Sequence, residues 1–101
     1  MFATKLRHRI NRILIKLEYH LGISKVLSMP KMISIDPTNH CNLKCPLCPT
    51  GLDDKSVDRG LMRLEQYKPI INRLGKWLQS VNLYSWGEPL LNKSFVDMVR
   101  Y

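Results

Sequence analysis

The sequence predicts an α/β fold in which an amphipathic amino-terminal helix precedes a βαβ unit with parallel strands. Apolar residues recur at helical spacing over residues 2–21 and again over 61–74. Short segments with the composition of strands, 32–36 and 81–84, stand on either side of the second helical segment. Strands that alternate with helices form parallel pairs through right-handed crossovers. The chain of 101 residues suits one small domain.

Residues 1–29 form a basic leader in which one face of the predicted helix is apolar. That face consists of Leu6, Ile10, Ile13, Leu14, Leu17 and Leu21. Their spacing places them along one side of a helix, which Gly22 would end. Residues 1–31 contain seven basic residues and one acidic residue, whereas residues 32–101 contain nine basic and seven acidic residues. The positive charge therefore belongs mainly to the leader.

Three interpretations of the leader stay open. The helix could pack on the rest of the protein or on another chain. Its basic residues also suit a helix that lies on an anionic membrane surface, which would give a membrane-peripheral location. A mitochondrial transit peptide fits less well, because such peptides are rich in Ser and the first serine here is Ser24. The longest apolar stretches are too short for a secretory signal or a bilayer-spanning helix.

The rest of the predicted fold lies in residues 30–101. Residues 32–36 alternate apolar and polar side chains, as a strand does, and residues 37–40 have the composition of a turn. The polar residues 52–60 predict an exposed loop.

The predicted helix over 61–74 contains Pro69, which would sit near the first turn or kink the helix, and Gly75 would end it. The second strand, 81–84, leads into the turn at 85–89.

A final helix begins near the carboxyl end of the chain. Asn92 or Ser94 would cap it, and Asp97 stands three residues after Ser94 as in a capping box. The apolar side chains of Phe95 and Met98 on this helix would need a further partner surface. We therefore expect the chain to be an amino-terminal piece of a longer protein.

Three cysteines, Cys41, Cys45 and Cys48, form a C-x3-C-x2-C pattern soon after the first predicted strand. An odd, clustered set of thiols suits a metal site better than a disulfide framework. Thiolates select iron–sulfur clusters, zinc or copper(I). Three of them can hold a cubane iron–sulfur cluster and leave one iron open to a substrate or cofactor. Clustered free thiols also indicate the reducing cytoplasm.

A small zinc-binding interaction module is the alternative. Structural zinc needs four ligands, and His40 would supply the fourth beside the three cysteines. His40 directly precedes Cys41, however, and neighbouring side chains in a tight loop rarely converge on one tetrahedral ion. No nucleic-acid partner is expected, because the basic charge lies on one helix without interleaved aromatic residues.

The segment around the cysteines resembles the signature of the radical S-adenosylmethionine (radical SAM) superfamily. Residues 36–49 read Asp-Pro-Thr-Asn-His-Cys-Asn-Leu-Lys-Cys-Pro-Leu-Cys-Pro, which is similar to the form in members with a SPASM or related auxiliary-cluster domain. Residues 86–91 resemble the second family signature, a Gly-Gly-Glu-Pro loop. The resemblance covers residues 30–101. It implies the truncated amino-terminal part of a radical SAM core domain, the first βαβ units of a partial (β/α)6 TIM-like barrel.

The resemblance implies that Cys41, Cys45 and Cys48 ligate three irons of a 4Fe-4S cluster, and that SAM chelates the fourth iron. The reduced cluster would cleave SAM to a 5′-deoxyadenosyl radical that abstracts hydrogen from an unactivated carbon. Such an oxidoreductase also needs an electron donor and a substrate. The SPASM-like form of the cysteine loop favours a peptide or protein as that substrate.

The same resemblance assigns residues to the SAM site. Gly87 and Glu88 would hydrogen-bond the SAM amino group, and Pro89 would fix the turn. Leu47 stands where the family usually has an aromatic residue against adenine, so it would pack without stacking. Trp86 replaces the first glycine of the second signature.

Overall fold

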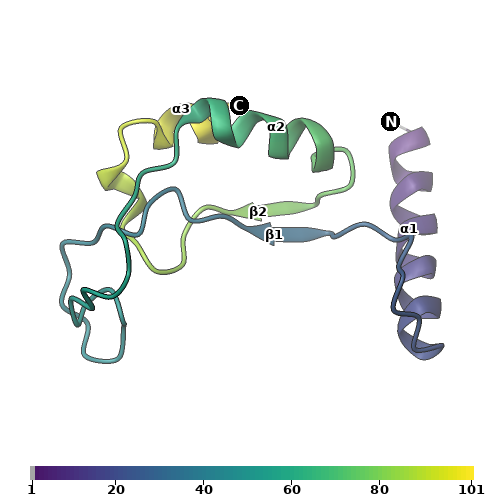
Figure 1. Cartoon of the computed structure of the whole chain (residues 1–101). Helices are drawn as coiled ribbons and strands as arrows, with labels where there is room; N and C mark the ends of the chain where they lie inside the picture. The colour runs from purple at the N-terminus through teal and green to yellow at the C-terminus, as the bar shows by residue number, and fades with distance from the viewer. Residues whose placement is uncertain (1) are drawn as a thin grey trace.

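The computed structural model describes residues 2–101, with side chains from Thr4 onward. Six elements follow one another along the chain (Figure 1): α1 (Phe2–His20), β1 (Met32–Ser34), α2 (Leu64–Leu74), β2 (Ser80–Asn82), the 3-10 helix η1 (Pro89–Leu91) and α3 (Phe95–Arg100). The leader helix, the helix between the strands and the final helix are confirmed. The described residues contain two strands, so the partial barrel stays a prediction.

The two strands pair in parallel, and α2 connects them in a βαβ unit. Ile33 lies opposite Val81 in this register. Ile35 extends the ladder, because its N–H donates a hydrogen bond to the carbonyl oxygen of Asn82 at 2.8 Å. Figure 1 shows α2 and α3 on the same face of the strands. The parallel pairing confirms what the alternation of strands and helices predicts.

A small core lies between the strands and the two helices that cover them. Its buried members are Ile35 at the end of β1, Tyr67 in α2 and Met98 in α3. Ile33 and Val81 pack against them from the paired strands. Burial raises the pKa of the Tyr67 phenol. This core fixes the strands, and with them the two loops that leave their carboxyl ends.

Both strands end earlier than predicted. β1 stops at Ser34, and the backbone hydrogen bonds between the two strands end with the one from Ile35. At Asp36 the side chain, and not the backbone, accepts a hydrogen bond from the N–H of Trp86 at 3.2 Å. β2 covers Ser80–Asn82 in place of 81–84. The N–H of Gln79 donates to the carbonyl oxygen of Lys31 at 2.7 Å, which sets the pairing one residue earlier.

The second helix begins three residues later than predicted. Leu61 forms an isolated antiparallel bridge with Thr38, so it belongs to the loop that faces the end of β1. α2 then starts at Leu64, after Arg63 as N-cap. The side-chain oxygen of Gln66 accepts the N–H of Arg63 at 2.9 Å and satisfies one of the free donors at the helix start.

The remaining helix signals are partly correct. Pro69 lies inside α2, which continues past it and ends before Gly75. The side chain of Ser94 makes no capping hydrogen bond, so the capping box with Asp97 is wrong. The side chain of Asn92 makes the hydrogen bond before this helix instead, because its Oδ1 accepts the N–H of Ser94 at 2.9 Å.

The leader helix ends at the predicted glycine. Gly22 has a φ of 63°, the left-handed region that glycine favours. The N–H of Ile23 donates to the carbonyl oxygen of Glu18 at 3.0 Å and that of Gly22 donates to Tyr19 at 3.3 Å, which is a Schellman cap. Figure 1 shows α1 at the amino-terminal end of the strands, away from the cysteine loop. Among residues 2–101, no helix combines the length and apolarity needed to cross a membrane.

Candidate functional site

The two segments that resemble family signatures leave the carboxyl ends of the paired strands and touch each other. The cysteine loop, residues 37–48, follows β1, and residues 83–89 follow β2. The N–H of Glu88 donates a hydrogen bond to the carbonyl oxygen of His40 at 2.8 Å. In parallel sheets this edge is where ligands bind. The structure therefore brings the cysteine loop and residues 83–89 into one region.

Gly87 makes this approach possible. A Cβ added at Gly87 would lie 1.9 Å from the carbonyl oxygen of Thr38 and 3.0 Å from the Cα of Asn39. These neighbours are backbone atoms, which cannot swing aside as a side chain does. Glycine is therefore required at this position for the two loops to meet.

A network of hydrogen bonds holds the start of the cysteine loop. Thr38 is buried, and its hydroxyl donates to the carbonyl oxygen of Gly60 at 2.9 Å and accepts the N–H of His40 at 3.0 Å. The Asn39 side chain donates to the carbonyl oxygen of Asp58 at 2.7 Å and accepts the N–H of Gly60 at 2.6 Å. Arg59 donates to the carbonyl oxygen of Asn39 at 2.8 Å. The loop at 52–60 thus supports the turn before the cysteines.

The three cysteines are free thiols in one loop. Cys41 and Cys48 are half-buried, and Cys45 is exposed. The N–H of Cys48 donates to the carbonyl oxygen of Cys45 at 3.2 Å, which closes a turn between them. Gly51 packs against this turn, since a Cβ there would lie 2.6 Å from the backbone nitrogen and oxygen of Cys45. The three cysteines therefore lie on a compact loop.

One of the thiols has a lowered pKa. The backbone of Gly51 forms the hydrogen bond that lowers the pKa of Cys48 most, and burial opposes it. Thr50 adds backbone and side-chain hydrogen bonds, and the charge of Arg59 acts in the same direction. A stabilised thiolate is the form that binds metal.

The donor set fits a thiolate-bound cluster in its chemistry. Across the described residues, no group of three His, Cys, Asp or Glu side chains is already arranged to hold a metal ion. His40 is exposed, and it is joined to no such group in residues 2–101. Cys41, Cys45 and Cys48 therefore stay predicted ligands, whose side chains would have to turn toward one point.

Of the residues predicted to contact SAM, Gly87, Glu88 and Pro89 lie in the loop after β2, whereas Leu47 lies in the cysteine loop. Glu88 is half-buried, and its Oε1 accepts the N–H of Leu90 at 3.1 Å, so the carboxylate caps η1 with one oxygen. Pro89 is the first residue of η1. Leu47 is 95% exposed, so its predicted packing on adenine stays a prediction. Trp86 is 53% exposed.

Comparison with known proteins gives one informative relative. The chain is similar to PqqA peptide cyclase of Rhodopseudomonas palustris. The two are 26% identical over 87 residues, which is 84% of this chain and 22% of that enzyme. The chain thus spans about a fifth of the relative's length. No family model and no solved structure matches the chain.

The similarity to PqqA peptide cyclase extends beyond the two loops. A match over 84% of the chain is longer than residues 30–101 alone, so it includes part of the leader. Wherever its ends fall, a segment of that length contains residues 41–48. The cysteine loop therefore lies inside the region that is similar to the cyclase.

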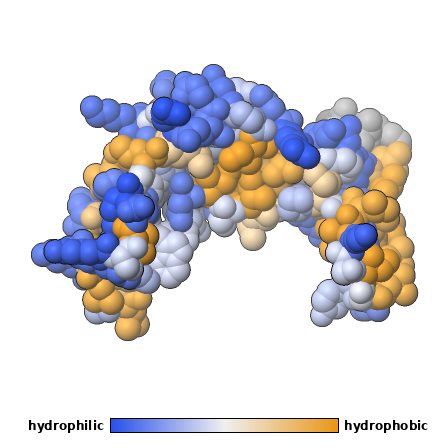
Figure 2. Space-filling model, viewed as in Figure 1, coloured by the Kyte–Doolittle hydropathy of each residue, from blue (hydrophilic) through white to orange (hydrophobic). Residues whose placement is uncertain are grey.

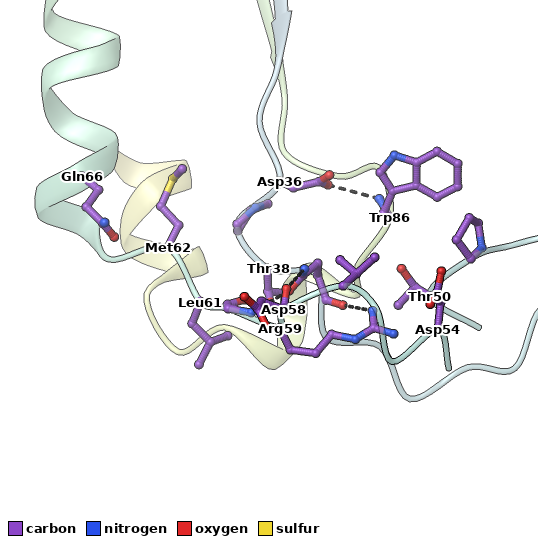
Figure 3. Close-up of a pocket in the computed structure, with 15 residues that line it drawn as sticks. Asp36, Thr38, Thr50, Asp54, Asp58, Arg59, Leu61, Met62, Gln66 and Trp86 are labelled. Carbon is purple, nitrogen blue, oxygen red and sulfur yellow. Dashed lines mark hydrogen bonds between the residues drawn. The ribbon is translucent and has the colours of Figure 1, made fainter. Parts of the chain in front are cut away.

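A cavity of about 680 Å³ lies beside the cysteine loop (Figure 3). Its wall includes Asp36, Asn39, Asp54, Arg59 and Trp86, and it includes none of the three cysteines. Hydrogen bonds from the side chain and backbone of Ser56 lower the pKa of Asp54, and the charge of Arg59 adds to this effect. The sequence does not predict this cavity, because its wall combines both loops with residues 49–62.

Proposed function

We propose that this chain is the amino-terminal part of a radical SAM enzyme that modifies a peptide. The contact between Glu88 and His40 carries the proposal, because it joins the loop with the predicted cluster ligands to the loop with the predicted SAM contacts. The similarity to PqqA peptide cyclase, whose name states a peptide substrate, supports the substrate class. The activity belongs to the longer protein, with an electron donor as further partner.

In this proposal the chain's own residues hold and orient the cofactors. Cys41, Cys45 and Cys48 would hold a 4Fe-4S cluster through three of its irons, which would leave one iron for SAM. The bound cluster supplies the electron that starts radical chemistry from SAM. Glu88 offers a carboxylate to the SAM ammonium group, and such a charge-assisted hydrogen bond is stronger than a neutral one. Gly87 keeps the two loops in contact.

Anaerobic reconstitution with iron and sulfide tests the proposal. After reduction, we expect a 4Fe-4S signal in the low-temperature electron paramagnetic resonance spectrum, and a change in that signal when SAM is added. Each of the variants Cys41→Ser, Cys45→Ser and Cys48→Ser should lose bound iron. Thr50→Ser, a conservative change two residues after Cys48, should keep it.

Two results would argue against the proposal in different ways. Stoichiometric zinc with no iron would favour the zinc-binding module that includes His40. A cluster that forms but does not respond to SAM would mean that residues 83–89 do not complete a SAM site in this chain.

A further inference from the structure

Three parallel stripes of side chains run along α1, and each has a different environment. The apolar stripe consists of Leu6, Ile10, Ile13 and Leu17. The basic stripe consists of Lys5, Arg9, Arg12 and Lys16, each one residue before a member of the apolar stripe. The third stripe is a pair of residues, Asn11 and Glu18, which stand seven positions apart on the other side of the apolar stripe.

Asn11 and Glu18 fasten residues 27–29 to α1. The Asn11 side chain donates to the carbonyl oxygen of Met29 and accepts its N–H, both at 2.8 Å. The Glu18 carboxylate accepts the N–H of Leu27 at 2.6 Å and hydrogen bonds from the backbone and hydroxyl of Ser28. Asn11 and Glu18 are buried under this segment. We call this arrangement the clasp.

The clasp leaves the apolar stripe facing solvent. Leu6, Ile10 and Leu17 are each 51% exposed, and Ile13 is 58% exposed. Leu27, which the clasp holds beside the helix, is 82% exposed. Figure 2 shows apolar surface along the limb that α1 forms. A groove of about 300 Å³ between α1, Leu27 and Trp77 continues this surface.

The positive charge of α1 decides between two possible partners for this surface. All members of the basic stripe are exposed, and Glu18, the single acidic residue among residues 2–20, is held in the clasp. A second copy of the chain would bring two basic stripes together, which is unfavourable. An anionic lipid surface instead attracts the basic stripe while its acyl chains accept the apolar one.

We infer that α1 is an interfacial anchor that lies on an anionic lipid bilayer, with the apolar stripe and Leu27 inserted at the headgroup boundary. Long basic side chains next to the stripe reach the phosphate groups while their stems stay in contact with apolar atoms. α1 and the cysteine loop lie at opposite ends of the strands (Figure 1), so anchoring through α1 leaves the candidate site uncovered by the anchoring helix.

Co-sedimentation of the full chain with lipid vesicles tests this inference. One set of vesicles contains phosphatidylcholine alone, and the other contains phosphatidylcholine and phosphatidylglycerol in equal parts. We expect binding to the second set only, and weaker binding as salt is added. Removing one basic residue should weaken binding about fivefold, so Arg9→Gln with Arg12→Gln should weaken it about twenty-fivefold. Lys55→Gln with Lys93→Gln removes the same charge elsewhere and should change binding little.

A second pair of variants tests the apolar stripe. Ile13→Ser with Leu17→Ser should abolish binding to the anionic vesicles. Leu52→Ser with Val96→Ser is the matched control, because these side chains are 65% and 51% exposed and lie far along the chain from α1. Circular dichroism should show that all variants keep their helix content.

Several results would overturn the inference. These are equal binding to both sets of vesicles, no binding to either set, and full binding by the Ile13→Ser, Leu17→Ser variant. A concentration-dependent dimer that disappears in that variant would also overturn it, since a second copy would then cover the stripe.

Discussion

The N–H of Glu88 donates a hydrogen bond to the carbonyl oxygen of His40 across 2.8 Å. This contact joins the residue before Cys41 to the residue after Gly87, although the two loops belong to different strands. The parallel pairing of β1 and β2 makes the contact possible, because both loops then leave the same edge of the sheet. The geometry of the candidate site depends on this backbone bond.

Gly87→Ala should separate the two loops. The new Cβ would lie 1.9 Å from the carbonyl oxygen of Thr38, so the backbone must move and the bond between Glu88 and His40 should break. Forced overpacking of this kind costs about 1–3 kcal/mol. Urea unfolding measures the loss in the free energy of unfolding. Gly60→Ala is the control, because a Cβ at Gly60 meets no atom within 4 Å. Equal unfolding midpoints for the two variants would contradict this account.

Glu88→Gln tests the charge at the predicted SAM contact. The amide oxygen of glutamine can still accept the N–H of Leu90, so η1 should persist. Charge-assisted hydrogen bonds exceed neutral ones by about 1 kcal/mol, so SAM should bind to the reconstituted protein about fivefold more weakly. The SAM-dependent change in the cluster signal measures this binding. Glu65→Gln, on the exposed start of α2, should leave the affinity for SAM unchanged.

The local parts of the fold were predictable from the sequence. The spacing of Leu6, Ile10, Ile13 and Leu17 predicts α1. Gly22 marks the end of this helix, because the Schellman cap is formed by residues that directly follow it in the sequence. The alternation of strands and helices also predicts the parallel βαβ unit. These features depend on short-range patterns, which a sequence displays directly.

The supports of the candidate site could not be predicted in the same way. Thr38 and Asn39 have ordinary turn composition, yet their side chains bind residues 58–60. Those partners become neighbours only after α2 brings the chain back to the end of β1. The strand ends also depend on a long-range bond, from Gln79 to Lys31. The roles of the cysteines stay predictions, because free thiols in a loop do not by themselves specify a metal.

Asn92→Ala should strongly destabilise the fold. Asn92 is 5% exposed, and its side-chain nitrogen donates to the carbonyl oxygens of Pro37 at 2.7 Å and Met62 at 2.8 Å. Its oxygen also accepts the N–H of Ser94. Alanine removes all three bonds. The Met62 carbonyl oxygen and the Ser94 N–H lose this partner, whereas the Pro37 carbonyl oxygen still accepts the N–H of Met62 at 2.7 Å. Each buried group without a partner costs about 1–3 kcal/mol. We expect a loss of at least about 2 kcal/mol in the free energy of unfolding.

The control for this variant is Asn42→Ala, at an exposed position in the cysteine loop. Its free energy of unfolding should stay within about 0.5 kcal/mol of the parent value. If Asn92→Ala unfolded at the same urea concentration as Asn42→Ala, the bonds of Asn92 would not hold together the segments that follow β1 and precede α2 and α3.

The clasp on α1 should open in acid. The hydroxyl of Ser28 lowers the pKa of Glu18 most, burial opposes this, and the backbone amides of Leu27 and Ser28 lower it further. A lowered folded-state pKa means that the clasp is at full strength above the ordinary glutamate pKa of about 4.3 and is lost as pH falls through the lower value. Amide NMR signals of Leu27 and Ser28 should therefore shift, and their hydrogen exchange should lose protection, in that acid range. Glu18→Gln should remove this acid step, whereas Glu65→Gln should keep it. An acid response of the Leu27 and Ser28 amides that is the same in the parent protein and in Glu18→Gln would show that the Glu18 carboxylate does not hold the segment to α1.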